Sequence, residues 1–180
     1  MKRKTLIRRI WNRIAAVLAR LLPGGQSIRP ILHRLRGMKI GANVFIGDDV
    51  YLENEYPECI EIGDNVEIAL RSIVLAHSRG KGKVIIGKDA HIGPNCIVLA
   101  SGGKTIRIGE GSVIGSGLIV SKNIPDNMFV PSVTSNPIAR VTEPYHGSSL
   151  EDFVRGLRPI HGKRKSQKNS KTTAETEETP

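Results

Sequence analysis

Aliphatic residues recur every six positions between Ile40 and Val120, and glycine commonly follows them. All twelve leading positions are Ile, Leu or Val, and seven of them are followed directly by glycine. They form four trios that begin at Ile40, Ile62, Ile86 and Ile108, in steps of 22, 24 and 22 residues. A period of this length is typical of a solenoid, in which each repeat packs only on its neighbours.

Three six-residue sides account for most of each period, and the extra residues fall after the third side, in the segments 56–61, 78–85 and 102–107. The sequence therefore predicts a three-sided prism of about four turns. Short parallel strands form its sides, and the leading aliphatics point inward. At one corner of each turn the extra residues form a longer loop, which we call an excursion. Glycine suits the corners, where a positive φ or a close backbone approach is needed. An α-helix is excluded because each glycine would cost about 0.8–1 kcal/mol in its interior.

The net charge of +10 is concentrated at the N-terminus. Residues 1–36 hold ten Lys or Arg and no acid, whereas residues 37–141 hold ten basic and eleven acidic residues. The few aromatic residues argue against a base-stacking nucleic-acid module, so no nucleic-acid partner is expected. Two cysteines, Cys59 and Cys96, are too few for a disulfide framework or a four-ligand zinc site. No apolar stretch is long enough to span a bilayer.

The chain divides into a basic segment 1–37, a repeat domain 38–141, an extension 142–161 and a tail 162–180. Apolar spacing predicts an amphipathic helix over 5–22, stopped by Pro23-Gly24-Gly25, and a second short helix over 30–36. The first helix has three interpretations: a cap on the open first turn, a peripheral contact with anionic membrane, or a contact with an acidic protein. A short helix is expected over 149–157, and the polar composition of 162–180 predicts disorder.

Two of the five histidines, His77 and His91, lie in the repeats. His77 stands at the base of the longest excursion, beside the flexible stretch Gly80-Lys81-Gly82. An imidazole there, pointing away from the packed interior, is placed to take a proton from an alcohol or amine that attacks a thioester. An ordinary exposed loop histidine is the alternative.

Residues 38–141 resemble the hexapeptide-repeat acyltransferase family, whose members fold as left-handed parallel β-helices. Segment 114–125 is similar to the family's terminal coil, and segment 136–141 to its Asn-Pro-Ala-basic closing motif. Leu75-Ala76-His77-Ser78 looks like the catalytic-histidine segment of the galactoside- and maltose-type O-acetyltransferase branch. The resemblance implies that His77 is the general base, and it leaves His91 as a surface or wall residue. It also implies a homotrimer that uses acetyl-CoA.

Coenzyme A lies between adjacent prisms in this family, and the resemblance places Gly93, Ser116, Gly117, Lys122 and Arg140 in its site. Ser116 and Gly117 are small enough to admit the pantetheine arm, and their backbone amides can contact it. Lys122 and Arg140 can contact phosphate, Arg140 through a planar fork. Solvated surface charge is the alternative for these two residues. No metal is expected, because the repeats lack a third histidine for a zinc site.

The expected function is acetyl-CoA-dependent O-acetylation of a hydroxyl on a sugar or cell-surface polysaccharide precursor. The expected location is the cytoplasm. Under the membrane-contact interpretation, residues 5–22 would lie on the inner membrane face. Two alternatives stay open: N-acetylation of an amino sugar, and a catalytically silent β-helix that serves as a scaffold.

Overall fold

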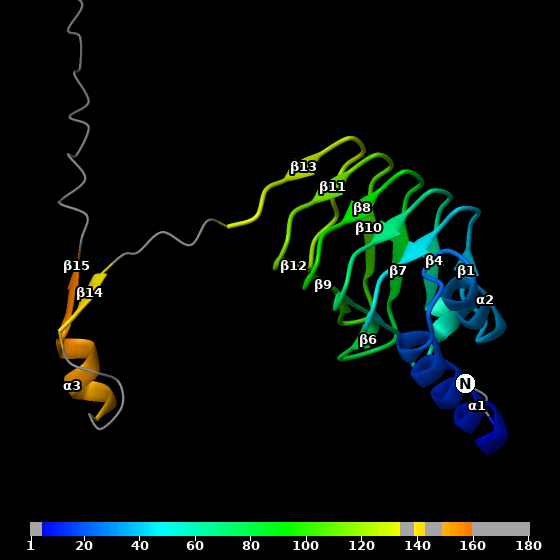
Figure 1. The fold of residues 1–180 in the computed structure, drawn as a ribbon, viewed down its shortest axis with the longest axis horizontal. Coiled ribbons are helices and arrows are strands. Elements are labelled where there is room, and N and C mark those ends of the chain that lie inside the picture. Colours follow the sequence, from blue (N-terminus) through cyan, green and yellow to red (C-terminus); the bar gives the residue numbers. More distant parts are fainter. Residues whose placement is uncertain (1–4, 134–138, 143–148, 160–180) are drawn as a thin grey trace, which may run out of the picture. The chain divides into compact units, whose positions relative to one another are not determined.

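The computed structural model describes residues 5–133, 139–142 and 149–159 (Figure 1). These residues belong to two compact units, 1–133 and 134–180.

The first unit is a parallel β-solenoid whose three sheets are the sides of the predicted prism. Sheet A contains β1 (Lys39–Ile40), β4 (Ile60–Ile62), β7 (Lys83–Ile86) and β10 (Thr105–Ile108). Sheet B contains β2 (Phe45–Ile46), β5 (Glu67–Ile68), β8 (His91–Ile92), β11 (Val113–Ile114) and β13 (Phe129–Val130). Sheet C contains β3 (Tyr51–Leu52), β6 (Ile73–Ser78), β9 (Ile97–Ser101) and β12 (Ile119–Val120). Every strand pair in these sheets is parallel, so the predicted mainly β solenoid fold is confirmed.

The core consists of the leading aliphatics stacked in register from turn to turn. In sheet B, for example, Ile46 pairs with Ile68, Ile68 with Ile92 and Ile92 with Ile114, and all four are buried. Side chains alternate along a strand, so each sheet directs the intervening residues outward. The six-residue period therefore builds a continuous aliphatic column along the solenoid.

The glycines that follow the leading aliphatics are required by close backbone approach. A Cβ on Gly63 would lie 2.6 Å from the backbone nitrogen of Lys88 in the next turn. Positive φ occurs two residues further along, at residues such as Asn65 (φ 55°) and Asp89 (φ 57°). The Asn65 side-chain amide donates to Asp89 Oδ1 at 2.8 Å, so these corner residues also form polar contacts between turns.

Two helices, α1 (Leu6–Leu21) and α2 (Ile28–Leu35), lie at the first-turn end of the solenoid (Figure 1). Arg29 of α2 donates to the carbonyl of Ile46 at 3.0 Å and pairs with Asp48, which ties α2 to the first turn. The side of α1 that packs inward is small or polar, and its buried residues are Asn12, Ala15, Ala16 and Ala19. No helix in the described ranges is long and apolar enough to cross a membrane.

The second unit pairs β14 (Ala139–Val141) with β15 (Leu157–Pro159) in an antiparallel ribbon, and α3 (Leu150–Arg155) precedes β15. The Ser149 hydroxyl accepts from the backbone N–H of Asp152 at 3.2 Å and caps α3. The first compact unit ends at residue 133, and β14 and β15 both belong to the second. The expected closing-motif residues Asn136, Pro137 and Ile138, and the expected disordered tail 162–180, lie outside the described residues.

Candidate active site

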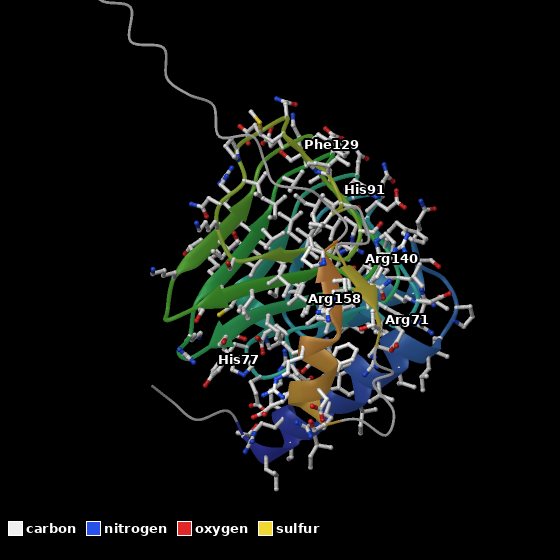
Figure 2. All side chains as sticks on the ribbon, turned by 90° about the vertical axis from the view of Figure 1, so that its left-hand side faces the viewer. Arg71, His77, His91, Phe129, Arg140 and Arg158 are labelled. Atoms are coloured by element: carbon white, nitrogen blue, oxygen red, sulfur yellow. The ribbon has the colours of Figure 1, made fainter. Side chains whose placement is uncertain are left out.

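His77 lies near the end of β6, on the outward face of sheet C (Figure 2). Strand alternation sends Val74 and Ala76 into the core, and it turns His77 outward with 38% of its side chain exposed. The chain then leaves the sheet in the excursion that precedes β7, where the backbone N–H of Gly82 donates to the carbonyl of Ala76 at 2.6 Å.

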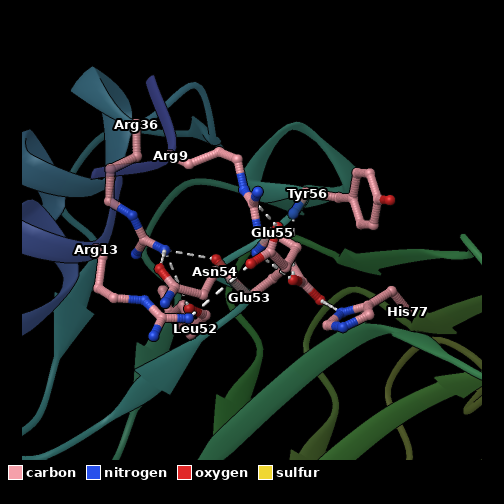
Figure 3. A network of polar contacts seen from close by, with 9 residues as sticks. All are labelled: Arg9, Arg13, Arg36, Leu52, Glu53, Asn54, Glu55, Tyr56 and His77. Carbon is pink, nitrogen blue, oxygen red and sulfur yellow. Dashed lines mark hydrogen bonds and ion pairs between the residues drawn. The ribbon is translucent and has the colours of Figure 1, made fainter. Parts of the chain in front are cut away.

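The carboxylate of Glu53 is the direct partner of this imidazole (Figure 3). Glu53 follows β3 one turn earlier and is fully buried, at 0% exposure. Its Oε2 lies 2.5 Å from His77 Nδ1 and also accepts from the backbone N–H of Ala76 at 3.0 Å. Its Oε1 accepts from the backbone N–H groups of Glu55 at 2.8 Å and Tyr56 at 3.2 Å.

These contacts determine the charge of Glu53 and the tautomer of the neutral His77 ring. Burial alone would raise the pKa of the Glu53 carboxyl, but the hydrogen bonds from His77, Ala76 and Tyr56 outweigh burial and hold that pKa below its ordinary value. The group is therefore a carboxylate at neutral pH and can only accept hydrogen bonds. His77 Nδ1 must carry the hydrogen, which makes Nε2 the basic nitrogen of the neutral ring.

Tyr56 and Lys81, from the two neighbouring excursions, continue the line of contacts that starts at the imidazole. The Tyr56 ring meets the His77 ring edge-on, with centroids 5.7 Å apart. Lys81 Nζ lies 4.9 Å from the centroid of the Tyr56 ring and 3.2 Å from Glu58 Oε1, and this hydrogen bond raises the pKa of Lys81. The imidazole, the Tyr56 ring and the Lys81 ammonium are therefore linked by successive contacts, and we call the surface formed by these three residues the rim of the site.

Behind Glu53, the buried guanidinium of Arg36 holds the backbone of the first excursion (Figure 3). Arg36 donates to the carbonyl of Glu53 at 2.6 Å and to Asn54 Oδ1 at 3.0 Å. Another of its nitrogens lies 2.7 Å from His33 Nδ1. Burial lowers the pKa of Arg36 to about 10, so the side chain is still a cation at neutral pH. The end of α2 is thereby tied to the turn that carries the carboxylate.

His91 occupies a different side of the solenoid, on β8 in sheet B (Figure 2). Its Nδ1 lies 3.3 Å from Glu67 Oε2, on the neighbouring strand β5. Glu67 is itself half exposed, so this pair lacks the buried carboxylate that orients His77. The two histidines of the repeats therefore do not share a site.

Three of the five expected cofactor residues lie together at the corner between sheets B and C. A Cβ on Gly93 would lie 2.9 Å from the backbone nitrogen of Ser116, so the two residues stack in successive turns. Gly117 adopts a φ of +73°, and a Cβ on it would meet open space. Lys122 is exposed after β12, and Arg140 is exposed on β14 of the second unit, opposite Arg158.

Sequence reasoning missed Glu53, Tyr56 and Lys81. The signal for Glu53 was present, because an acid directly follows the leading Leu52 at a place where glycine or another small or aliphatic residue usually stands. It also lies one turn, 24 residues, before His77. Tyr56 and Lys81 lie in the excursions, whose path the repeat does not determine.

Known proteins resemble this chain in its repeats. A family model described as the hexapeptide repeat of succinyl-transferase matches residues 37–69 and 83–122. "Putative acetyltransferase YvoF" of Bacillus subtilis is 34% identical over 98 residues, which are 52% of this chain and 55% of the relative. The bifunctional protein GlmU of Methylibium petroleiphilum is 31% identical over 106 residues, 51% of this chain and 22% of that protein. The chain thus spans about half the length of the first relative and less of the second.

Among solved structures, the hexapeptide-repeat-containing acetyltransferase VCA0836 from Vibrio cholerae is 17% identical, with a TM-score of 0.48. That match covers 70% of this chain and 86% of the other. The repeats of this chain are thus similar to the hexapeptide repeat, and the chain is similar over about half its length to a protein named as an acetyltransferase.

Proposed function

We propose that the protein is an acetyl-CoA-dependent O-acetyltransferase and that His77 is its general base. The observation that carries the proposal is the hydrogen bond between the buried Glu53 carboxylate and His77 Nδ1. A buried carboxylate that fixes one tautomer of a half-exposed imidazole leaves Nε2 facing the rim as a base. The acceptor is a hydroxyl of a sugar or of a cell-surface polysaccharide precursor, and the location is the cytoplasm.

The transfer is direct and needs no covalent enzyme intermediate. His77 Nε2 takes the hydroxyl proton while the acceptor oxygen attacks the thioester carbonyl of acetyl-CoA. The new C–O bond forms, the C–S bond breaks, and the imidazolium returns the proton to the departing sulfur. Glu53 stabilises the imidazolium during this exchange. General-base assistance of this kind supplies about 10²- to 10⁴-fold in rate.

The cofactor is proposed to lie along the exposed corner formed by Ser116 and Gly117, with the buried Gly93 beneath Ser116 in the preceding turn. The exposed backbone at Gly117 gives a narrow pantetheine chain room to approach. Lys122 is proposed to contact phosphate, which its exposure permits. No metal takes part in the proposed transfer.

A homotrimer is proposed because the outward face of sheet C is apolar beside His77. Ile73, Leu75, Ile97 and Leu99 are half-buried on that face, and Ile119 is 69% exposed. A second copy that covered this face would lie next to His77, which belongs to the same sheet.

The test is titration calorimetry with coenzyme A followed by an assay of thiol release from acetyl-CoA with sugar acceptors. We expect saturable binding of about one coenzyme A per chain in the native protein. His77→Ala should lower kcat by about 10²-fold or more and leave coenzyme A affinity nearly unchanged. His91→Ala is the matched control and should keep full activity. Full activity in His77→Ala would refute the assignment.

The alternatives give different results in the same experiment. Release of thiol only with amino sugars would make the enzyme an N-acetyltransferase with the same base. Absence of coenzyme A binding by the folded protein would leave a catalytically silent scaffold.

A further inference from the structure

An apolar surface covers the outer side of the two N-terminal helices. We call it the helical apolar face and define it by Ile7, Trp11, Ile14, Leu21, Ile31 and Leu35. Ile7 is 81% exposed and Leu21 76% exposed, which is far more than large aliphatics show when they stabilise a fold. Exposed apolar surface of this extent marks an interaction site rather than a packing contact.

The way α1 packs explains why its apolar side is left outside. Ala15, Ala16 and Ala19 lie against the rest of the unit with almost no exposure, and Asn12 is buried beside them. On the same side, Arg8 donates to the carbonyls of Leu35 at 3.4 Å and Arg36 at 3.0 Å. Small and polar residues therefore hold the helix in place, and the large aliphatic residues project in the opposite direction.

Basic residues flank this surface, and acids are absent from the sequence around it. The first acidic residue of the chain is Asp48, while residues 1–36 carry ten Lys or Arg. Along one flank of α1, Arg9 and Arg13 reach Glu55 only at 3.8 and 4.0 Å and stay well exposed. The two arginines share one carboxylate, so this flank keeps a net positive charge that an external anionic surface can meet.

We infer that the helical apolar face docks the protein on an anionic lipid bilayer, with α1 lying in the plane of the interface. The 16 residues of α1 extend about 24 Å, and apolar side chains point away from the solenoid along this whole length. A wide aliphatic stripe with a basic flank and a tryptophan is the pattern of an interfacial helix. An acidic protein partner would complement the basic flank of Arg9 and Arg13. It would not complement the helical apolar face, which contains no polar residue.

Docking would also bring the candidate active site to the membrane. Arg9 and Arg13 pair with Glu55, two residues after the carboxylate that orients His77 (Figure 3). The rim around His77 therefore lies next to the docking helix. This step rests on the proposed function and assigns the acceptor to sugars carried on a lipid, whereas the docking itself does not depend on activity.

The single tryptophan of the chain reports on docking directly. The full-length protein is mixed with phosphatidylcholine vesicles that contain phosphatidylglycerol, and with pure phosphatidylcholine vesicles. Anionic vesicles should shift Trp11 emission to the blue and carry the protein down on sedimentation, and added salt should weaken both effects. Pure phosphatidylcholine should give much weaker binding.

The double variant Ile7→Asn/Ile14→Asn should fold normally, because both residues are exposed, and should bind anionic vesicles at least about tenfold more weakly. Phe129→Asn removes an apolar residue at the last turn whose exposed fraction, 69%, lies between those of Ile7 and Ile14; it is the control and should bind as the native protein does. The inference is overturned by three results: no blue shift with anionic vesicles, equal binding to neutral ones, or a double variant that binds normally. A double variant that instead lost a self-association of the native chain would identify the occupant as a second copy.

Discussion

At the scale of single residues, the pair formed by Glu53 and His77 places a buried negative charge beside the proposed base. A carboxylate with no exposed surface is costly unless hydrogen bonds replace its hydration. Glu53 meets that requirement with three backbone N–H groups and the imidazole. The same residue closes the first excursion and orients the proposed base, so its structural and catalytic roles share one set of contacts.

Glu53→Gln separates these roles. An amide offers acceptor lone pairs on one side only, so it cannot satisfy both His77 and the N–H groups of the excursion. If its NH₂ group faces His77, the ring must place its hydrogen on Nε2 and is no longer a base. We expect kcat to fall by about 10²- to 10⁴-fold, with an unchanged KM for acetyl-CoA.

The double variant Glu53→Gln/His77→Ala provides the control. Its residual activity should equal that of His77→Ala, because a positioning residue has no effect once the base is gone. A further loss of activity in the double variant would show that Glu53 acts on its own.

Sequence reasoning could predict the place of His77, and the sequence marks Glu53 as an unusual acid in the repeat, but the contact between the two residues could not be predicted. The six-residue period determines which residues point inward and which outward, and it therefore predicts an outward His77. The contact with Glu53 arises from stacking of one turn on the next and from the path of an excursion, and neither is encoded by the local period.

At the scale of elements, the same limit applies to α1. Its spacing predicted a helix over 5–22, and the structure has one over Leu6–Leu21. The periodicity gives two faces but does not say which one meets the protein. The inward face consists of alanines and Asn12, and the adjacent Arg9 and Arg20 pair with Glu55 and Asp49 of the first turn.

The attachment of α2 to the first turn predicts acid sensitivity. Burial, with the nearby Arg36 cation as a second cause, lowers the pKa of His33 to about 3. His33 in the unfolded chain binds a proton below about pH 6.5, whereas the folded chain keeps it neutral. Unfolding therefore takes up a proton between these values. The free energy of unfolding should fall by about 1.4 kcal/mol per pH unit below pH 6.5 from His33 alone.

Urea unfolding at pH 7 and at pH 4.5 measures this loss. His33→Gln should remove about 2–3 kcal/mol of the difference between the two pH values, because glutamine does not titrate. An unaltered pH dependence in His33→Gln would contradict the assignment of acid sensitivity to this histidine.

At the scale of the whole molecule, the three sheets differ in what they present to the outside. Sheet A presents charged residues, among them Lys39 and Lys83, which both pair with Glu61 at 2.7 and 2.8 Å. Sheet C presents an aliphatic row, and His77 lies on the same face. The charged outer face of sheet A is well hydrated in solution. The aliphatic outer face of sheet C, which also carries the proposed base, is the kind of surface that subunit interfaces bury.

The proposed trimer can be tested on that face with Ile119→Asp. An aspartate in a closed apolar interface would be a buried, unpaired charge, so the variant should dissociate into folded monomers. Sedimentation velocity measures the mass, and circular dichroism shows whether the strands persist. Phe129→Asp places the same charge on sheet B at an equal exposed fraction, 69%, and should remain trimeric. If acetyl-CoA lies between subunits, Ile119→Asp should also lose coenzyme A binding even though Glu53 and His77 are intact. A native protein that sediments as a monomer and still transfers acetyl groups would contradict the trimer, and the site would then be complete within one chain.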